Sequence, residues 1–278
     1  MGGEAGDDNK VKDTIDAVTG LVKAIPIYED AIQPVAKQVG KSLETVGKAI
    51  NVALAPVGAL VWGYEKCQEF ISTKVADRLK NVPPDDIITP KPNVAGPAIE
   101  ALRYTGHEES LSDMYANLLA AAMDKNTADG AHPAFVEIIK QLTPDEAKLI
   151  AYFMRRQAFP IVSVRADNKE AGQGGYDVAV NVSLFGEKAG LALPDLVPSY
   201  LDNLSRLGLI DIRAVSYSDM THYDELESSG KLASHKAEVE LSDHIFHLVR
   251  GGVSVTNLGK QFGRVCVNRH QETPENPA

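Results

Sequence analysis

Residues 107–150 carry the clearest pattern of apolar and polar positions in the chain. Apolar residues recur there at spacings of three and four, the period of an amphipathic helix; they are Leu111, Met114, Tyr115, Leu118, Leu119 and Ala122. After a polar loop at 124–131, His132 and Pro133 predict the start of a second helix, because proline is tolerated at the first helical position. Thr143 followed by Glu146 predicts a third helix that begins with a capping box. Three helices in series predict a compact helical core.

The chain before this stretch is also predicted to be helical. We expect a short disordered lead-in at 1–10, and apolar periodicity then predicts helices over about 11–25 and 28–50. Residues 81–92 hold four of the chain's 15 prolines, so they predict an irregular connector. Pro97 is then expected at the start of the helix that leads into 107–150.

Residues 49–64 form a run of sixteen residues without a charged side chain. A membrane-spanning helix needs about 20 apolar residues, and Pro56 would kink or interrupt a helix here. A helix buried among its neighbours is therefore favoured, and a segment that inserts into a membrane is the alternative. Trp62 and Tyr64, at one end of the run, are the candidate contacts because aromatic rings favour the membrane interface.

From Thr143 onward the pattern mixes helices with strands. The expected order is a helix from Pro144, strands at 159–165 and 176–182, a helix at 198–207 ended by Gly208, strands at 209–213, 237–241 and 253–256, and a last helix at 256–267. This order resembles a winged helix. The predicted fold class is thus α+β and mostly helical, with an N-terminal and central helical bundle at 11–142, a winged-helix-like α/β domain at 143–270 and a disordered tail at 271–278.

Charge bears on the partners that such a domain can bind. The chain has 28 basic and 38 acidic residues and a net charge of −10, which argues against a general nucleic-acid binder. The helix at 198–207 offers only Arg206 for phosphate contacts, with Asp195 and Asp202 close by. A protein-binding winged helix is therefore favoured over a DNA-reading one.

The reactive side chains form no recognisable catalytic or metal-binding motif. His244 and His247 lie three residues apart, and on a strand such residues face opposite sides. The sequence holds no HExxH, no CxxC, no nucleophile elbow and no glycine-rich phosphate loop. No catalytic, cofactor-binding or metal-binding residue is predicted, and a non-enzymatic protein is favoured. A hydrolase or nuclease whose residues assemble from distant positions stays an alternative.

The two cysteines and the N-terminus indicate the compartment. Cys67 and Cys266 each lie on an apolar helical stripe, which predicts buried thiols rather than a disulfide. The first ten residues lack the apolar run of a secretory signal. The expected location is the cytoplasm.

Several segments together resemble one bacterial family. They are APVGALVWGYEK (55–66), ESLSDMYANLLAAAMD (109–124), HPAFVEIIKQLTPDEAKLI (132–150), LDNLSRLGLI (201–210) and VTNLGKQF (255–262). The chain resembles the abortive infection alpha (Abi-alpha) family, whose domain has no established biochemical function. The resemblance implies a role in defence against phage, in which an infected cell arrests or dies before phage spread.

Two classes of function then compete. The first is a non-enzymatic effector or sensor that meets a partner protein, a phage component or, on activation, a membrane through 49–64; an oligomer is compatible with it. The second is a transcriptional regulator that binds DNA through the winged helix and depends on Arg206. The acidic composition favours the first.

Overall fold

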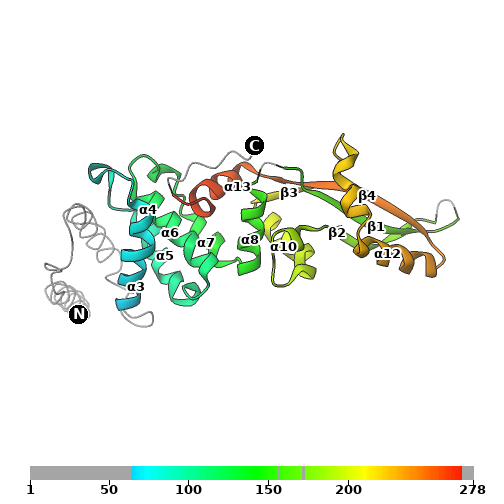
Figure 1. Cartoon of the computed structure of the whole chain (residues 1–278), viewed down its shortest axis with the longest axis horizontal. Helices are drawn as coiled ribbons and strands as arrows, with labels where there is room; N and C mark the ends of the chain where they lie inside the picture. Colours follow the sequence, from blue (N-terminus) through cyan, green and yellow to red (C-terminus); the bar gives the residue numbers. More distant parts are fainter. Residues whose placement is uncertain (1–63, 156, 171–172, 271–278) are drawn as a thin grey trace, which may run out of the picture. The chain divides into compact units, whose positions relative to one another are not determined.

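The computed structural model describes residues 64–155, 157–170 and 173–270 (Figure 1). Within them the fold is a mostly helical α+β arrangement with one four-stranded antiparallel sheet. These residues form two compact units, 64–107 with Tyr115–Val136, and Glu108–Met114 with 137–270. The expected lead-in and tail, the helices predicted at 11–25 and 28–50, and residues 49–63 of the apolar run lie outside the described residues.

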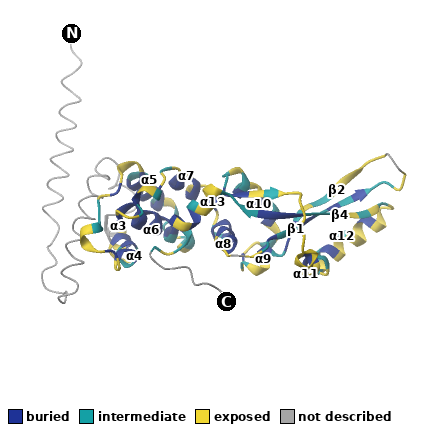
Figure 2. Ribbon diagram, turned by 90° about the horizontal axis from the view of Figure 1, so that it is seen from above, coloured by how far each residue is buried: buried dark blue, intermediate teal, exposed yellow. Residues whose placement is uncertain are grey.

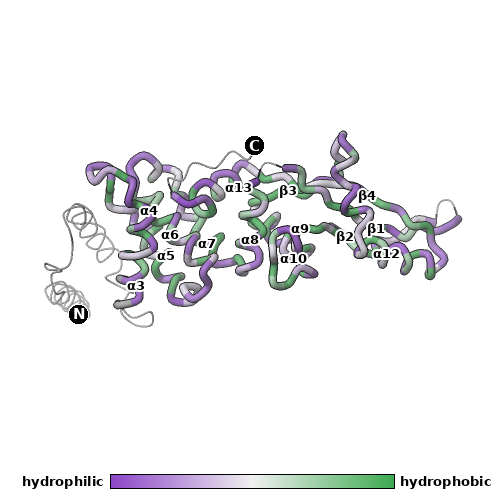
Figure 3. The backbone as a smooth tube through the Cα atoms, in the orientation of Figure 1, coloured by the Kyte–Doolittle hydropathy of each residue, from purple (hydrophilic) through white to green (hydrophobic). Residues whose placement is uncertain are grey.

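Helix α6 (Glu109–Met123) confirms the amphipathic stripe that the sequence predicts. All six stripe residues are at most 4% exposed, and Figure 2 shows the buried colour along α6 and α7 (Ala134–Lys140). The neighbouring helical segments are α3 (Tyr64–Phe70), the π-helical turn η1 (Ile71–Val75), α4 (Ala76–Leu79) and α5 (Pro92–Thr105). In Figure 3, apolar and polar positions alternate along these helices, as expected for helices that share a core.

The proline-rich connector is irregular, as predicted, apart from a 3-10 turn at Pro84–Asp86. It is fixed to the end of α6, because the amide of Ile88 donates to the carbonyl of Met123 at 2.8 Å. The prediction that Pro97 begins the next helix was wrong. Helix α5 begins at Pro92, and Pro97 lies inside it, where the missing amide removes one backbone bond without ending the helix.

Helix α8 (Pro144–Phe153) begins with the predicted capping box. The hydroxyl of Thr143 accepts from the amide of Glu146 at 3.2 Å, and Glu146 Oε2 accepts from the amide of Thr143 at 2.7 Å. At its other end, Phe153 packs edge-on against Phe159 and Phe185, with ring centroids 4.9 and 5.2 Å apart. The helix is therefore positioned by a satisfied N-terminus and an aromatic cluster.

The sheet has the order β2-β1-β4-β3. Its strands are β1 (Pro160–Asp167), β2 (Gly175–Val182), β3 (Ile210–Arg213) and β4 (Ile245–Val255). On β1 the side chains of Val162, Val164 and Ala166 are fully buried. The residues between them point to the opposite face, as the period of two requires.

Strand β2 departs from the alternation that the sequence predicts. Tyr176 and Val180, expected on a buried face, are 51% and 46% exposed. The pairing register with β1 shifts twice along the strand, and Asn181 adopts a φ of 56°. Such bulges turn side chains to new directions and disfavour pairing of an edge strand with another chain.

The helices around the sheet are α9 (Phe185–Lys188), α10 (Val197–Arg206), α11 (Asp224–Glu227), α12 (Gly230–Leu241) and α13 (Asn257–Phe262). The 3-10 turns are η3 (Ala128–Gly130), η4 (Pro194–Leu196) and η5 (Met220–Tyr223), and the π-helical turn η6 (Gly263–Val267) follows α13. Gly208 ends α10 at a φ of 73°, as predicted. The predicted strand at 237–241 was wrong, since these residues belong to α12.

Burial decides the state of the two cysteines. Cys67 and Cys266 are both buried thiols, as the sequence predicts. Burial raises the pKa of Cys67 to about 11 and the pKa of Cys266 well above its ordinary value, so both stay protonated at neutral pH. Across 64–155, 157–170 and 173–270, no helix is long and apolar enough to span a membrane.

Candidate functional site

The end of the sheet near the β1–β2 turn carries four interacting polar side chains on one face. We call Arg165, Asp167, Asp177 and His247 the charged row. Arg165 lies opposite Asp177 of β2 and opposite His247 of β4 in the strand register. Directly opposed residues on antiparallel strands share a face, so three strands bring these side chains together.

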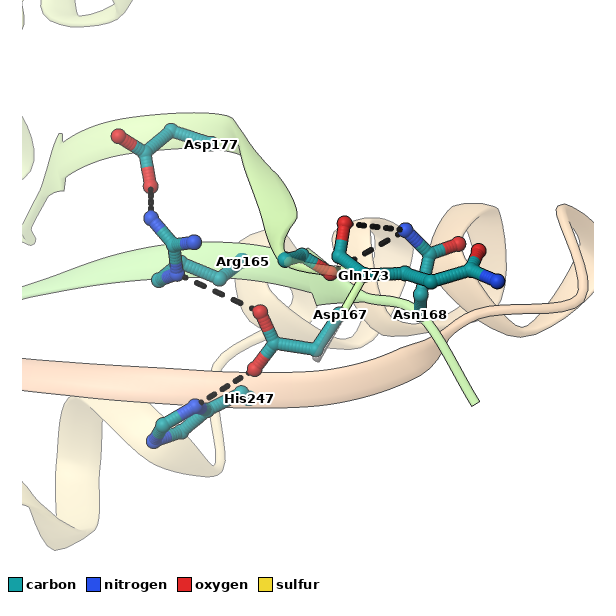
Figure 4. Close-up of polar contacts among 7 residues, drawn as sticks. Arg165, Asp167, Asn168, Gln173, Asp177 and His247 are labelled. Atoms are coloured by element: carbon teal, nitrogen blue, oxygen red, sulfur yellow. Dashed lines mark hydrogen bonds and ion pairs between the residues drawn. The ribbon is translucent and has the colours of Figure 1, made fainter. Parts of the chain in front are cut away.

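Figure 4 shows how the charged row is connected. Arg165 Nη1 donates to Asp177 Oδ1 at 2.9 Å, and Arg165 Nε lies 3.5 Å from Asp167 Oδ1. The second oxygen of Asp167 lies 2.9 Å from His247 Nδ1. Each member is thus held by at least one neighbour, while the side chains of Asp177 and His247 stay 49% and 58% exposed.

The electrostatics of the row keep Asp167 ionised. The hydrogen bond with His247 holds the pKa of Asp167 below its ordinary value, and the charge of Arg165 acts in the same direction. Because a carboxylate only accepts, His247 Nδ1 carries the proton in this contact. The other imidazole nitrogen, Nε2, is then the group that His247 can present to a partner.

Asn168, which follows β1 next to the row, is also held by hydrogen bonds. Asn168 donates through its side chain to the carbonyls of Gln173 and Gly174 at 3.3 and 3.2 Å (Figure 4). The backbone N–H of Asn168 also donates to the carbonyl of Gly174, at 3.0 Å. Gly174 adopts a φ of 71°, an angle that favours glycine. The ends of β1 and β2 are therefore closed by hydrogen bonds beside the charged row.

The opposite face of these strands is covered. Val162, Val164 and Ala166 share a hydrophobic cluster with residues of η5, α11 and α12, namely Tyr223, Leu226, Leu232 and Val239. Figure 1 shows α12 lying along β1 and β4. The sheet therefore has one covered apolar face and, near the turn, one exposed polar face.

None of the candidate residues taken from the sequence is a member of the charged row. Trp62 is outside the described residues, and Tyr64 is the first residue of α3, where its side chain is not described. Arg206, at the end of α10, donates to Asn203 Oδ1 at 2.6 Å and to Gln141 Oε1 at 3.0 Å. Arg206 thus joins α10 to the end of α7 rather than standing alone as a phosphate contact.

The two histidines weighed as metal ligands have separate environments. His247 contacts Asp167, whereas His244 precedes β4, and its ring lies edge-on to Tyr176 at 5.4 Å. In the part of the chain that the structure describes, no group of three or more His, Cys, Asp or Glu is placed to hold a metal ion. His132 acts as a helix cap, accepting from the amide of Ala134 at 3.1 Å.

An Asp–His pair also orients the base in some hydrolases, so the surroundings of His247 matter. Within 64–155, 157–170 and 173–270, no hydroxyl or thiol is hydrogen-bonded to His247. The nearest hydroxyl along β1, Ser163, accepts from the amide of Asn181 at 3.4 Å. The contact of His247 that the structure describes is therefore the one with Asp167.

Comparison with known proteins supplies a family. The family model described as abortive infection alpha matches residues 63–266. The chain belongs to the abortive infection alpha family. This confirms the resemblance that the sequence motifs indicate.

Other comparisons add little to this membership. None of the curated proteins compared with the chain matches it. A solved structure of an uncharacterised protein from the hydrocarbon-degrading marine bacterium Alcanivorax borkumensis SK2 is similar at 22% identity, over 48% of this chain and 92% of that one, with a TM-score of 0.35.

Two motifs behind the family resemblance have structural roles here. In TPDEAKLI, Glu146 completes the capping box, and its Oε1 accepts from Asn203 of LDNLSRLGLI at 2.7 Å. The charged row was missed by sequence reasoning. The sequence pattern that could have indicated the row is the alternation of Ser163, Arg165 and Asp167 with residues that are fully buried on β1. Such alternation is typical of a strand with one polar face.

Proposed function

We propose that this protein acts in abortive infection as a non-enzymatic effector or sensor, and that it works by binding a partner protein. Family membership supports the defence role. The charged row supports the mode of action, because it is exposed on one side and fixed by its own contacts. Side chains that are already ordered lose less entropy on binding. The partner is a protein of the cell or a component of the phage.

We further propose that 143–270 is a winged-helix-like interaction module. The order α8, β1, α9, α10, β3, β4 and the strand order β1-β4-β3 support it. Strand β2 and the insertion at 214–244 are additions to that plan. Asp177 of β2 is a member of the charged row, so one of these additions contributes to the row.

A DNA-binding regulator is the main competing function. It would need Arg206 to contact phosphate, but this side chain donates to Asn203 and Gln141. Asp202 is exposed on the same helix, and its charge would repel phosphate. The contacts of α10 therefore support a structural role for Arg206.

Contact with a membrane through 49–64 on activation is the alternative mode of action, and the run of sixteen residues without a charged side chain supports it. We centre the proposal on the charged row.

Two arginine variants separate the competing functions. The chain is expressed in phage-sensitive bacteria, and plating efficiency is measured for wild type, Arg165→Gln and Arg206→Gln. Binding through the charged row predicts that Arg165→Gln lowers protection by roughly tenfold or more, the effect of losing a strong contact. It also predicts that Arg206→Gln protects like wild type. The opposite pattern would support the regulator, and no protection by wild type would reject the defence role.

A further inference from the structure

The insertion between β3 and β4, residues 214–244, has two parts that are anchored differently. The first part is tied to the strands by polar contacts. Tyr223 donates its hydroxyl proton to the carbonyl of Gly251 at 2.8 Å and accepts from the amide of Tyr217 at 3.1 Å. Arg250 of β4 makes two bonds to Glu227, one of them at 2.9 Å. Tyr223 and Glu227 therefore fix this first part to β4.

Helix α12, the second part, has far fewer anchors. Only Leu232 and Val239 are buried in its twelve residues, at 3% and 1% exposure. Leu241, its last residue, is 88% exposed. Among the described residues, no hydrogen bond or ion pair joins the side chains of 232–242 to a strand. Figure 2 shows the mainly exposed colouring of α12.

Ion pairs at the surface flank the two ends of α12. Lys231 pairs with Glu187 at 2.6 Å and lies 3.7 Å from Asp195. Beyond the other end, Asp243 pairs with Lys169, and both side chains are more than half exposed. Solvent screens ion pairs at the surface, so such pairs contribute little to stability and do little to hold the helix.

The residues at the two junctions of α12 have open space around them or an uncommon backbone angle. Before it, Ser229 caps the helix, and Gly230 lies in open space, since a Cβ atom at this position would have no neighbouring atom within 4 Å. After it, Asp243 adopts a φ of 61°, uncommon for a residue other than glycine. Local opening follows when few apolar contacts hold a segment between such connections.

Opening of α12 would uncover apolar surface. Leu232 and Val239 share a buried cluster with Val162, Val164 and Ala166 of β1, and Phe246 and Leu248 of β4 are packed against the same cluster. This strip accepts two apolar side chains seven residues apart, which is two turns of a helix. Glu187 and Asp195 flank the position of Lys231, just before the first of them. The strip is therefore complementary to a helix with a basic residue followed by two apolar anchors.

We propose that α12 is a releasable cover, and that its opening lets this strip bind an amphipathic helix of a partner protein. The partner helix carries a basic residue, an apolar residue directly after it and a second apolar residue seven positions later. Grooves that take amphipathic helices are a common mode of recognition. The inference adds a second contact face to the proposed function and relies on that function only for its biological meaning.

Hydrogen exchange of the purified full chain tests the release. Helix α8 is the internal control, because it has ten residues and buries most of them. We expect the amides of 234–241 to exchange at least about tenfold faster than those of 148–153, since local opening exposes them without global unfolding. Equal or slower exchange in α12 would overturn the proposal.

A labelled peptide of residues 229–242 tests the docking strip. Fluorescence anisotropy is measured with wild type and with the variant L232A/V239A, whose own cover is weakened. We expect saturable binding that is roughly tenfold tighter to the variant. A peptide with the same two alanines should bind neither protein, and the solvent-face variant Lys236→Ala should behave like wild type.

Failure of the intact peptide to bind a folded L232A/V239A chain, or equal binding of both peptides, would overturn the docking strip. Should the variant not fold, the exchange measurement on wild type decides the proposal alone. Neither experiment involves phage, so their failure is distinguishable from failure of the defence role.

Discussion

Asp145 holds together two segments that are distant in sequence. Its carboxylate is 5% exposed and accepts from the amides of Ala192 and Leu193, both at 2.9 Å. Burial alone would raise its pKa, but these two amides and the charge of Lys148 together lower it below the ordinary value. The residue therefore ties the loop before α10 to the start of α8, and it does so as an anion.

Asp145→Asn is expected to lower the free energy of unfolding by about 2–3 kcal/mol. The Asn side chain has an NH2 group in place of one carboxylate oxygen, so one of the two backbone N–H groups loses its acceptor. Urea denaturation measures the change. Asp195→Asn is the matched control in the same loop. Its side chain is 91% exposed, so it should shift stability by less than about 0.5 kcal/mol. Equal effects of the two variants would contradict this role.

The same carboxylate makes stability depend on pH. Because its pKa is lower in the folded than in the unfolded chain, its contribution is complete above about pH 4 and is lost as the pH falls through the folded-state pKa. Asp145→Asn should therefore flatten the acid limb of the stability profile. An unchanged acid limb would show that other carboxylates dominate it.

His247 is expected to control the ionisation of Asp167. Replacing it in His247→Ala removes the hydrogen bond that contributes most to the lowered pKa of Asp167. That pKa should rise toward its ordinary value in an NMR titration of the carboxyl carbons. Asp219, whose pKa is lowered mainly by Thr221, is the control in the same sample. An unchanged pKa of Asp167 would show that Arg165 alone sets it.

At the scale of elements, two glycines serve different physical needs. Gly208 ends α10 in a Schellman arrangement, with the amide of Leu209 donating to the carbonyl of Leu204 at 3.0 Å. A Cβ there would meet only Leu258, at 3.5 Å. At Gly259, in α13, a Cβ would clash with the carbonyl oxygen of Leu209. Gly208 supplies a backbone angle, whereas Gly259 allows close packing.

Alanine substitutions should show which of these two glycines contributes more to stability. Gly208→Ala is expected to lower stability by about 1–2 kcal/mol through the positive φ alone. Gly259→Ala should cost about 3 kcal/mol or more, because backbone has to move to relieve the clash. Thermal or urea unfolding of both variants measures the order. A larger loss for Gly208→Ala would contradict the close approach of α13 to Leu209.

Elements with strong local signals could be predicted from the sequence. The capping box of Thr143 and the end of α10 at Gly208 depend on residues close to them in the chain, so both can be predicted from the local sequence. The prediction of a strand at 237–241 was wrong because Val239 and Leu241 alternate with glutamates, as the residues of a half-buried strand do. Over five residues a period of two is hard to tell from a helical one, and the deciding contact, Leu232 with the sheet cluster, lies outside that window.

At the scale of the molecule, the pairing of the strands explains why the charged row could not be predicted from the sequence. Arg165, Asp177 and His247 come from three strands, and only the pairing register brings them together. The two register shifts of β2 cannot be read from its alternating sequence. One face of this sheet is closed by η5, α11 and α12, and the other presents the charged row. The partner binding proposed above uses that exposed face.

Partner binding through the charged row is tested most directly by comparing a triple and a double variant during infection. The variant R165Q/D177N/H247A replaces three of the four side chains of the charged row and leaves Asp167, and K236Q/E240Q removes an exposed ion pair on the outer side of α12. Thermal unfolding first establishes that both are folded. Growth and phage release are then followed in cultures infected at a high ratio of phage to cells.

We expect the charged-row variant to release roughly tenfold more phage than wild type, while the α12 variant restricts phage like wild type. A folded charged-row variant that still stops phage release as wild type does would contradict partner binding through this face of the sheet.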